Sequence, residues 1–217
     1  MMHAKSTLFF DVDTQRDFIL PDGKLSVPGT DRIIANLAAV TNLARRLGIK
    51  IVASTDHHFP NDPELQRNGG EFVDHCMDGT AGQKKIDETT PLNPLFIANR
   101  ELSASELTAA VAHAGEIVLE KQLFDVFAGN RNAEALLRRL LVDYQDVVVY
   151  GVYTEICVRD AIKGLRELGA RLHIVEDAIA DIGAEGAAHR ARWRADGIEF
   201  LSVQQLSDQL ERSESRH

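Results

Sequence analysis

Short apolar runs of strand length alternate along this chain with segments of helical periodicity. The predicted strands are residues 7–12, 50–54, 116–120, 147–150, 171–175 and 198–201. Apolar residues recur three or four positions apart, as in helices, in residues 33–47, 105–114, 132–141, 158–168, 184–194 and 203–210. This alternation predicts right-handed βαβ crossovers and a parallel sheet covered on both faces. We therefore expect a single α/β domain over residues 1–217, a three-layer α/β/α sandwich.

Composition and charge restrict the class of protein further. The 217 residues suffice for one domain with a sizeable core, and the two cysteines do not form a disulfide framework. A net charge of -9 argues against a nucleic-acid or membrane partner, since both attract a concentrated basic face. No apolar stretch is long enough to span a bilayer, and no apolar signal segment opens the chain. We expect a cytoplasmic protein, with a homo-oligomer left open.

Helical and strand periodicity disappear between about residues 55 and 101. Four of the six prolines fall there, together with the pair Gly69-Gly70. An irregular segment of this length in a compact domain usually forms a lid or a binding loop. We expect residues 55–101 to form part of a site, and the polar residues 211–217 to be a frayed tail.

Reactive side chains follow four of the predicted strands. Asp13 follows the first strand, Asp56 and His58 the second, Lys121 the third and Cys157 the fourth. The carboxyl ends of parallel strands meet at one edge of the sheet, where ligands bind in open α/β folds. A thiol, a carboxylate and an ammonium group at one place favour nucleophilic catalysis.

Cys157 is the candidate nucleophile. It lies between a strand and a helix, where unpaired backbone N–H groups and the helix dipole favour a thiolate. Lys121 would help to hold that thiolate, and Asp13 could accept its proton and return it to a leaving amine. The alternative is that Cys157 only packs in the core, as we expect for Cys76.

A second group of residues has the chemistry of metal ligands. Asp56 and His58 stand two positions apart, and His75 follows across the long loop. Imidazole nitrogens with a carboxylate suit a divalent transition metal ion, with zinc favoured over manganese or iron. The alternative is that all three are polar loop residues that face water.

Five motifs together resemble those of the isochorismatase-like cysteine hydrolases, in particular the nicotinamidase branch. In chain order they are Asp13-x-Gln15-x-Asp17-Phe18, Asp56-x-His58, His75-Cys76-x-x-Gly79-Thr80-x-Gly82, Lys121 after a strand, and Gly151-Val152-x-Thr154-x-x-Cys157-Val158. The resemblance covers about residues 8–206. It implies a six-stranded parallel sheet and a catalytic triad of Asp13, Lys121 and Cys157.

The same resemblance implies details of the site. It implies a cis peptide that joins Val152 to Tyr153, and an oxyanion hole made by the backbone N–H groups of Tyr153 and Cys157. In nicotinamidases the metal ion binds the pyridine nitrogen, and Glu64 occupies the place where some members have a fourth ligand. The aromatic positions around the substrate ring correspond to Phe18, Phe72 and Tyr153.

The function expected from these residues is hydrolysis of nicotinamide to nicotinate and ammonia through a thioester on Cys157. Three positions depart from the nicotinamidase pattern, namely His57, Gln122 and Glu155, and relatives that act on N-carbamoyl compounds or other small amides share the triad. An isochorismatase-type vinyl-ether hydrolase is an alternative without a cysteine nucleophile. A non-catalytic metal-binding or redox-sensing protein is a third, and the absence of G-x-G-x-x-G disfavours a dinucleotide-binding fold.

Overall fold

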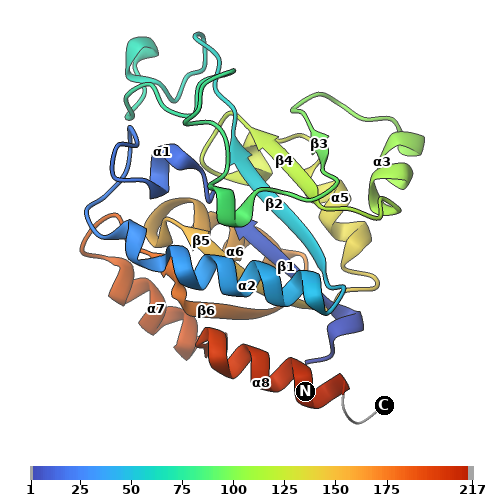
Figure 1. Cartoon of the computed structure of the whole chain (residues 1–217). Coiled ribbons are helices and arrows are strands. Elements are labelled where there is room, and N and C mark those ends of the chain that lie inside the picture. Colours follow the sequence, from blue (N-terminus) through green and yellow to red (C-terminus); the bar gives the residue numbers. More distant parts are fainter. Residues whose placement is uncertain (1, 215–217) are drawn as a thin grey trace.

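A seven-stranded parallel sheet forms the centre of the molecule (Figure 1). The computed structural model describes residues 2–214. The strands are β1 (Thr7–Val12), β2 (Lys50–Asp56), β3 (Leu95–Ile97), β4 (Ile117–Lys121), β5 (Asp146–Val152), β6 (Arg171–Ala180) and β7 (Glu199–Leu201). They are ordered β3-β4-β2-β1-β5-β6-β7, and every neighbouring pair is parallel. The expected α/β fold is confirmed.

The expected number of six strands is wrong by one. The additional strand, β3, is a three-residue edge strand inside the segment that showed no periodicity. Only Ile97 of β3 is fully buried, and Phe96 is 54% exposed. Because so short a strand with one buried side chain produces no alternating pattern, its pairing with β4 was not visible in the sequence.

Helices cover both faces of the sheet. They are α1 (Arg16–Ile19), α2 (Ile34–Arg46), α3 (Ala104–Val111), α4 (Val126–Gly129), α5 (Ala133–Leu140), α6 (Arg159–Glu167), α7 (Gly186–Ala195) and α8 (Val203–Glu214). Figure 1 shows α2 and α8 in front of the sheet and α6 behind it. Side chains of β1 alternate between the two layers: Phe9 packs with α2 and α8, and Phe10 packs with α3, α5 and α6.

The end of the chain differs from the expected frayed tail. Glu211 to Glu214 belong to α8, which an ion pair between Arg46 and Glu211 (2.6 Å) ties to α2. Ser213 is buried and its hydroxyl donates to the carbonyl of Leu210. Residues 215–217 lie outside the described part of the chain.

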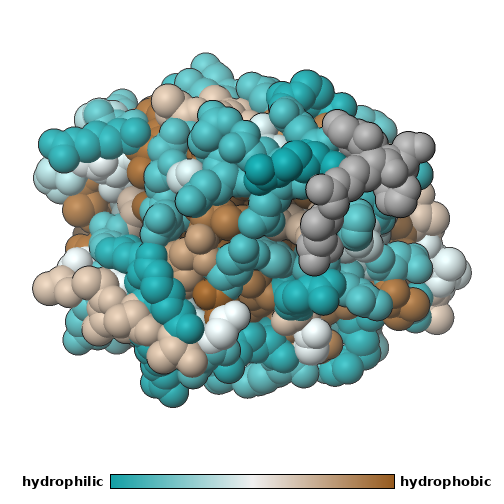
Figure 2. Space-filling model, turned by 90° about the horizontal axis from the view of Figure 1, so that it is seen from below, coloured by the Kyte–Doolittle hydropathy of each residue, from teal (hydrophilic) through white to brown (hydrophobic). Residues whose placement is uncertain are grey.

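The outer surface is mostly polar. Figure 2, which views the molecule from below, shows hydrophilic residues over most of that face, with apolar side chains visible between them. Across residues 2–214, each helix is either too short or too polar to cross a bilayer.

Candidate active site

The sheet order brings the predicted reactive residues to one edge. Strands β4, β2, β1 and β5 are neighbours, and their carboxyl ends lead to Lys121, Asp56, Asp13 and Cys157. The chain places β2 on one side of β1 and β5 on the other. Asp13 and the turn after β5 therefore lie where the strand order changes direction, which is the usual ligand site of open α/β sheets.

Lys121, Asp13 and Cys157 form a buried cluster. The Lys121 Nζ atom lies 3.0 Å from Asp13 Oδ2 and 3.8 Å from Cys157 Sγ, and it also bonds to Asp56 Oδ1. The Ser54 hydroxyl donates to Asp13 Oδ1 at 2.7 Å. Among the described residues, Asp13 Oδ2 makes an ion pair with Lys121 but no hydrogen bond. Asp13 has φ 49°, a costly conformation that is concentrated at functional sites.

Burial controls the protonation of the candidate nucleophile. Desolvation raises the pKa of Cys157 well above its ordinary value, against the opposing effect of the Lys121 ammonium. Burial also disfavours the ammonium, but the carboxylates of Asp13 and Asp56 raise the pKa of Lys121 well above its ordinary value. Burial therefore favours the neutral thiol, whereas helix position alone favours the thiolate. Such a thiol needs a base at the moment of attack.

The turn that carries Cys157 has an unusual backbone. Gly151 has φ 119°, and a Cβ atom there would lie 2.0 Å from the carbonyl oxygen of Val12. The peptide between Val152 and Tyr153 is cis. Cys157 then lies within a π-helical turn, Thr154–Val158, instead of the first turn of an α-helix. Single π-helical turns occur frequently at functional sites.

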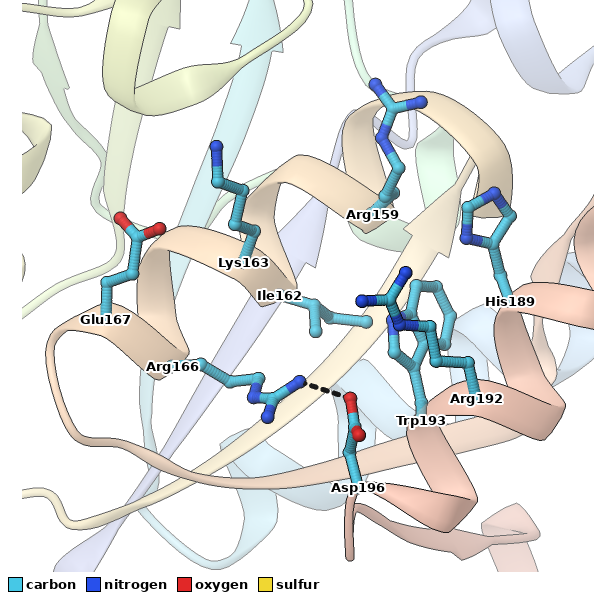
Figure 3. Close-up of a pocket in the computed structure, with 9 residues that line it drawn as sticks. All are labelled: Arg159, Ile162, Lys163, Arg166, Glu167, His189, Arg192, Trp193 and Asp196. Carbon is cyan, nitrogen blue, oxygen red and sulfur yellow. Dashed lines mark hydrogen bonds and ion pairs between the residues drawn. The ribbon is translucent and has the colours of Figure 1, made fainter.

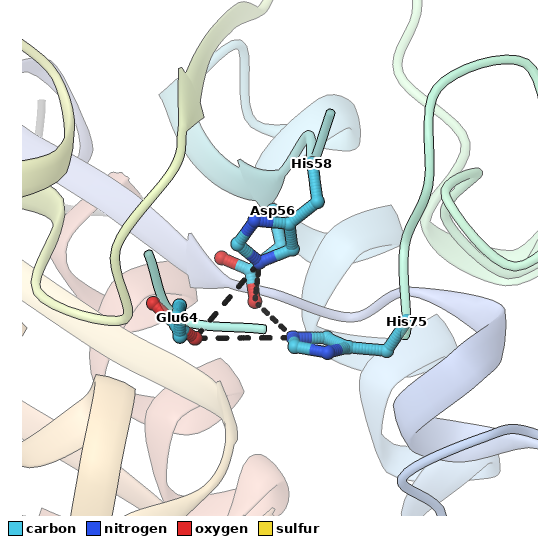
Figure 4. Close-up of side chains that lie close together, drawn as sticks. All are labelled: Asp56, His58, Glu64 and His75. Atoms are coloured by element: carbon cyan, nitrogen blue, oxygen red, sulfur yellow. Dashed lines mark ion pairs between the residues drawn. The ribbon is translucent and has the colours of Figure 1, made fainter. Parts of the chain in front are cut away.

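Asp56, His58, Glu64 and His75 point toward one another (Figure 4). All four are buried, and their ligand atoms lie within 4.8 Å of one another. His75 Nε2 lies 3.4 Å from Asp56 Oδ2 and 3.9 Å from Glu64 Oε1, and His58 Nε2 lies 3.8 Å and 3.9 Å from the same two atoms. The structure therefore brings together the three expected ligands and the weaker candidate Glu64.

This group fits a divalent cation. His58 Nδ1 pairs with Asp62 Oδ2 (3.1 Å) and His75 Nδ1 with the carbonyl of Val73 (2.8 Å), so both Nε2 lone pairs face the centre of the group. Within the described part of the chain, His58 Nε2 and Glu64 Oε2 are buried without hydrogen-bond partners. Burial, and then the Asp56 charge, raise the pKa of Glu64 to about 7. A positive ion at the centre would satisfy these atoms.

A small cavity joins the two groups. It is lined by Phe18, Leu25, Asp56, Glu64, Phe72, His75, Phe124, Tyr153, Ile156, Cys157 and Ile182. The His75 ring is a neighbour of Phe18 (5.6 Å between centroids) and Phe72 (6.0 Å), and Phe18 also packs against Tyr153 (6.0 Å). The Tyr153 hydroxyl lies 2.6 Å from the Phe18 carbonyl. The structure thus places all three predicted aromatic residues on the cavity wall.

Several supporting residues could not be assigned a role from the sequence. Gln15 holds the backbone of Asp56, because its Nε2 donates to the carbonyl (2.8 Å) and its Oε1 accepts from the N–H (2.7 Å). Phe124 packs against Phe72 (6.4 Å) and completes the aromatic wall. His57 faces away from the metal-ligand group and pairs with Asp78 and Glu120. His58 is the next residue in the sequence, so only the folded loop shows which of the two histidines belongs to the metal-ligand group.

A second, larger hollow lies between α6 and α7 (Figure 3). It measures about 500 Å³ and contains Arg159, Lys163, Arg166 and Arg192 over Trp193. Arg166 is paired with Asp196 at 2.7 Å. Its lining residues include neither a thiol nor a group that could hold a metal ion, so the smaller cavity is the candidate active site.

These features define an α/β protein with a buried cysteine, lysine and aspartate beside a group of metal ligands. The isochorismatase domain family matches residues 7–205, and the chain belongs to that family. It is 27% identical over 183 residues to the uncharacterized isochorismatase family protein PncA of Bacillus subtilis (strain 168), an alignment that covers 82% of this chain and 87% of that protein.

Solved structures of the same fold include two enzymes. The pyrazinamidase of Pyrococcus horikoshii, solved in complex with zinc, is 24% identical with a TM-score of 0.71 and covers 91% of this chain and 99% of its own. The N-carbamoylsarcosine amidase of Thermoplasma acidophilum is 28% identical with a TM-score of 0.67 and covers 91% and 96%.

Proposed function

We propose that this isochorismatase-family protein is a metal-assisted cysteine amidohydrolase that converts nicotinamide to nicotinate and ammonia. One observation carries the choice of substrate. The cavity beside Cys157 has aromatic walls, carboxylates at one end and no lysine or arginine among its described lining residues. An N-carbamoyl amino acid would bring a carboxylate for which the lining offers no lysine or arginine, whereas a neutral aromatic amide suits apolar walls.

The residues of the cluster support a mechanism in two halves. In the first, Cys157 Sγ forms a bond to the amide carbon while its proton passes to Asp13 Oδ2. The backbone N–H groups of Tyr153 and Cys157 stabilise the oxyanion, and each such donor is worth about 3 kcal/mol in the transition state. The C–N bond then breaks as Asp13 returns the proton to nitrogen, which releases ammonia and leaves a thioester.

Water completes the reaction. Asp13 accepts a proton from the water molecule that attacks the thioester carbon, and that proton passes to the sulfur as the C–S bond breaks. The Lys121 ammonium, fixed between two carboxylates, stabilises negative charge on the sulfur in both halves. Burial of the cluster excludes bulk water from the first half.

Asp56, His58, Glu64 and His75 would hold one divalent transition metal ion, for which zinc is the first candidate. When bound, the ion would supply a Lewis acid for the ring nitrogen of the substrate. Phe18, Phe72 and Tyr153 would then orient the ring so that its carboxamide faces Cys157. The protein residues alone hold and move the proton.

The test is ammonia release from nicotinamide, pyrazinamide, N-carbamoylsarcosine and aliphatic amides. We expect turnover of the two aromatic amides, loss of that turnover in Cys157→Ala, and retention in the matched variant Cys76→Ala. Turnover of only N-carbamoyl or aliphatic amides would reject the proposed substrate. Full activity of Cys157→Ala would reject the mechanism.

A further inference from the structure

Glu155 is a buried carboxylate that the mechanism does not use. It lies in the π-helical turn two residues before Cys157 and is 8% exposed. Its Oε2 atom accepts the N–H of Ile182 (2.9 Å), and its Oε1 atom accepts those of Gly183 and Gly186 (both 3.0 Å). Three backbone donors converge on one side chain, and bonds of this kind to an ionised carboxylate are roughly twice as strong as neutral ones.

These bonds hold a loop that borders the cavity. Residues 181–185 connect β6 to α7, and Ile182 in this loop lines the cavity together with Cys157. Gly186 is the first residue of α7, so the Glu155 carboxylate also lies at the positive end of that helix. The neighbouring Thr154 hydroxyl donates to the carbonyl of Ala180 at 3.0 Å. The turn and the loop are therefore joined as one unit.

We propose that Glu155 is a positioning residue that sets the width of the substrate cavity. Its carboxylate holds the loop at a fixed distance from the turn, and this keeps Ile182 in the wall of the cavity that Cys157 also lines. The cavity then admits a flat single ring and excludes a fused double ring. This inference rests on the proposed function, because it assigns substrate selectivity to the same cavity.

The chemistry of the side chain predicts which changes disturb the loop. In Glu155→Gln an amide NH₂ group faces backbone N–H donors, so at least one donor loses its acceptor. In Glu155→Asp the charge remains but the side chain is shorter by one methylene, so the loop must move or lose bonds. Glu185→Gln is the matched control, because Glu185 lies in the same loop and is exposed to solvent.

The first measurement is the ratio of kcat/KM for nicotinamide to that for quinoline-3-carboxamide. We expect this ratio to fall about tenfold in Glu155→Gln. A tenfold change corresponds to about the free energy of one hydrogen bond to a charged group. The change should appear chiefly in the KM values of the two substrates. Glu155→Asp and Ile182→Ala should lower it as well, and Glu185→Gln should leave it unchanged. A merely structural role would reduce both activities together without a change in the ratio, which would overturn the proposal.

The second measurement does not depend on the substrate. The rates at which iodoacetamide and the bulkier N-phenylmaleimide alkylate Cys157 are followed by peptide mass spectrometry, which separates Cys157 from Cys76. We expect the ratio of the N-phenylmaleimide rate to the iodoacetamide rate to be at least fivefold higher in Glu155→Gln than in the wild type. If the wild type hydrolyses no aromatic amide, the proposed function is rejected. The ratio of the two alkylation rates still tests whether Glu155 sets the width of the cavity. If Glu155→Gln does not fold, Glu155→Asp and Ile182→Ala decide, and unchanged ratios in both overturn the proposal.

Discussion

At the scale of single residues, the proposed mechanism depends on one carboxylate oxygen atom. Asp13 Oδ2 is buried and forms an ion pair with the Lys121 ammonium, but it makes no hydrogen bond within residues 2–214. Since burial raises the pKa of the Cys157 thiol, the proposed mechanism assigns to this oxygen the proton that leaves sulfur. A residue whose role is proton transfer affects the chemical step more than substrate binding.

Asp13→Asn should therefore lower kcat about 10²- to 10⁴-fold with a small change in KM. Steady-state ammonia release measures both constants. Asp22→Asn, which removes an exposed carboxylate from the turn after α1, serves as the control and should retain activity. A value of kcat near that of the wild type in Asp13→Asn would exclude Asp13 as the proton acceptor.

The two adjacent histidines after β2 provide a matched test of the metal group. His58→Ala removes a nitrogen whose lone pair faces three other ligands, whereas His57→Ala removes a side chain that pairs outward with Asp78 and Glu120. Elemental analysis of purified protein should find about one equivalent of metal in the wild type and in His57→Ala, and far less in His58→Ala. Equal metal content in the two variants would place the ion elsewhere.

At the scale of elements, the end of β5 fixes the position of Cys157, the candidate nucleophile. Gly151 lets β5 pass close to the carbonyl of Val12 while β1 and β5 stay paired. The chain then turns into the π-helical segment with Cys157 directed at the ends of β1 and β4. The predicted strand and helix around Cys157 were sufficient to find this turn, because their periodicities are local. The π-helical geometry depends on contacts with β1 and with the loop after β6, which no local pattern contains.

Gly151→Ala should destabilise the protein by several kcal/mol, since the added Cβ atom meets backbone at 2.0 Å as well as an unfavourable φ. Gly169→Ala is the matched variant, because Gly169 also has positive φ (86°) but no atom lies within 4 Å of the added Cβ. Its loss should be about 1–2 kcal/mol. Urea denaturation compares the two, and losses of equal size would show that φ alone determines the cost at Gly151.

At the scale of the whole molecule, the residues predictable from sequence are those at strand ends. The sequence placed four residues at one edge of the sheet because each follows a strand and parallel strands end at the same edge. These residues are Asp13, Asp56, Lys121 and Cys157. Phe124 and Ile182 were not found, because they reach the cavity from loops whose course depends on long-range packing. The strand β3 was missed for a related reason, since its pairing partner and not its own pattern defines it.

The opposite edge of the sheet carries a charge network around the buried Asp146, from which we expect a contribution to acid stability. Burial opposes ionisation of Asp146, but bonds from Arg171 and His173 outweigh it and lower the pKa of Asp146. A lowered folded-state pKa contributes stability that is present above the unfolded pKa, about 3.9, and is lost as the pH falls through the folded value. Asp146→Asn should therefore flatten the acid limb of a plot of unfolding free energy against pH. An unchanged acid limb would exclude this network as its source.

The metal-ligand group and the Asp13–Lys121 pair together determine the net charge of one buried region. When Glu64 is ionised, the buried side chains of Asp13, Asp56 and Glu64 carry three negative charges against the single positive charge of Lys121. A bound cation would favour this ionised form of Glu64, whose pKa burial and Asp56 raise to about 7. A divalent ion among the ligands would make this interior region electrically neutral, whereas the same charges are dispersed in water when the chain unfolds. Uptake of such an ion would be coupled to folding, and the cation proposed to orient the substrate would also support the carboxyl edge of the sheet.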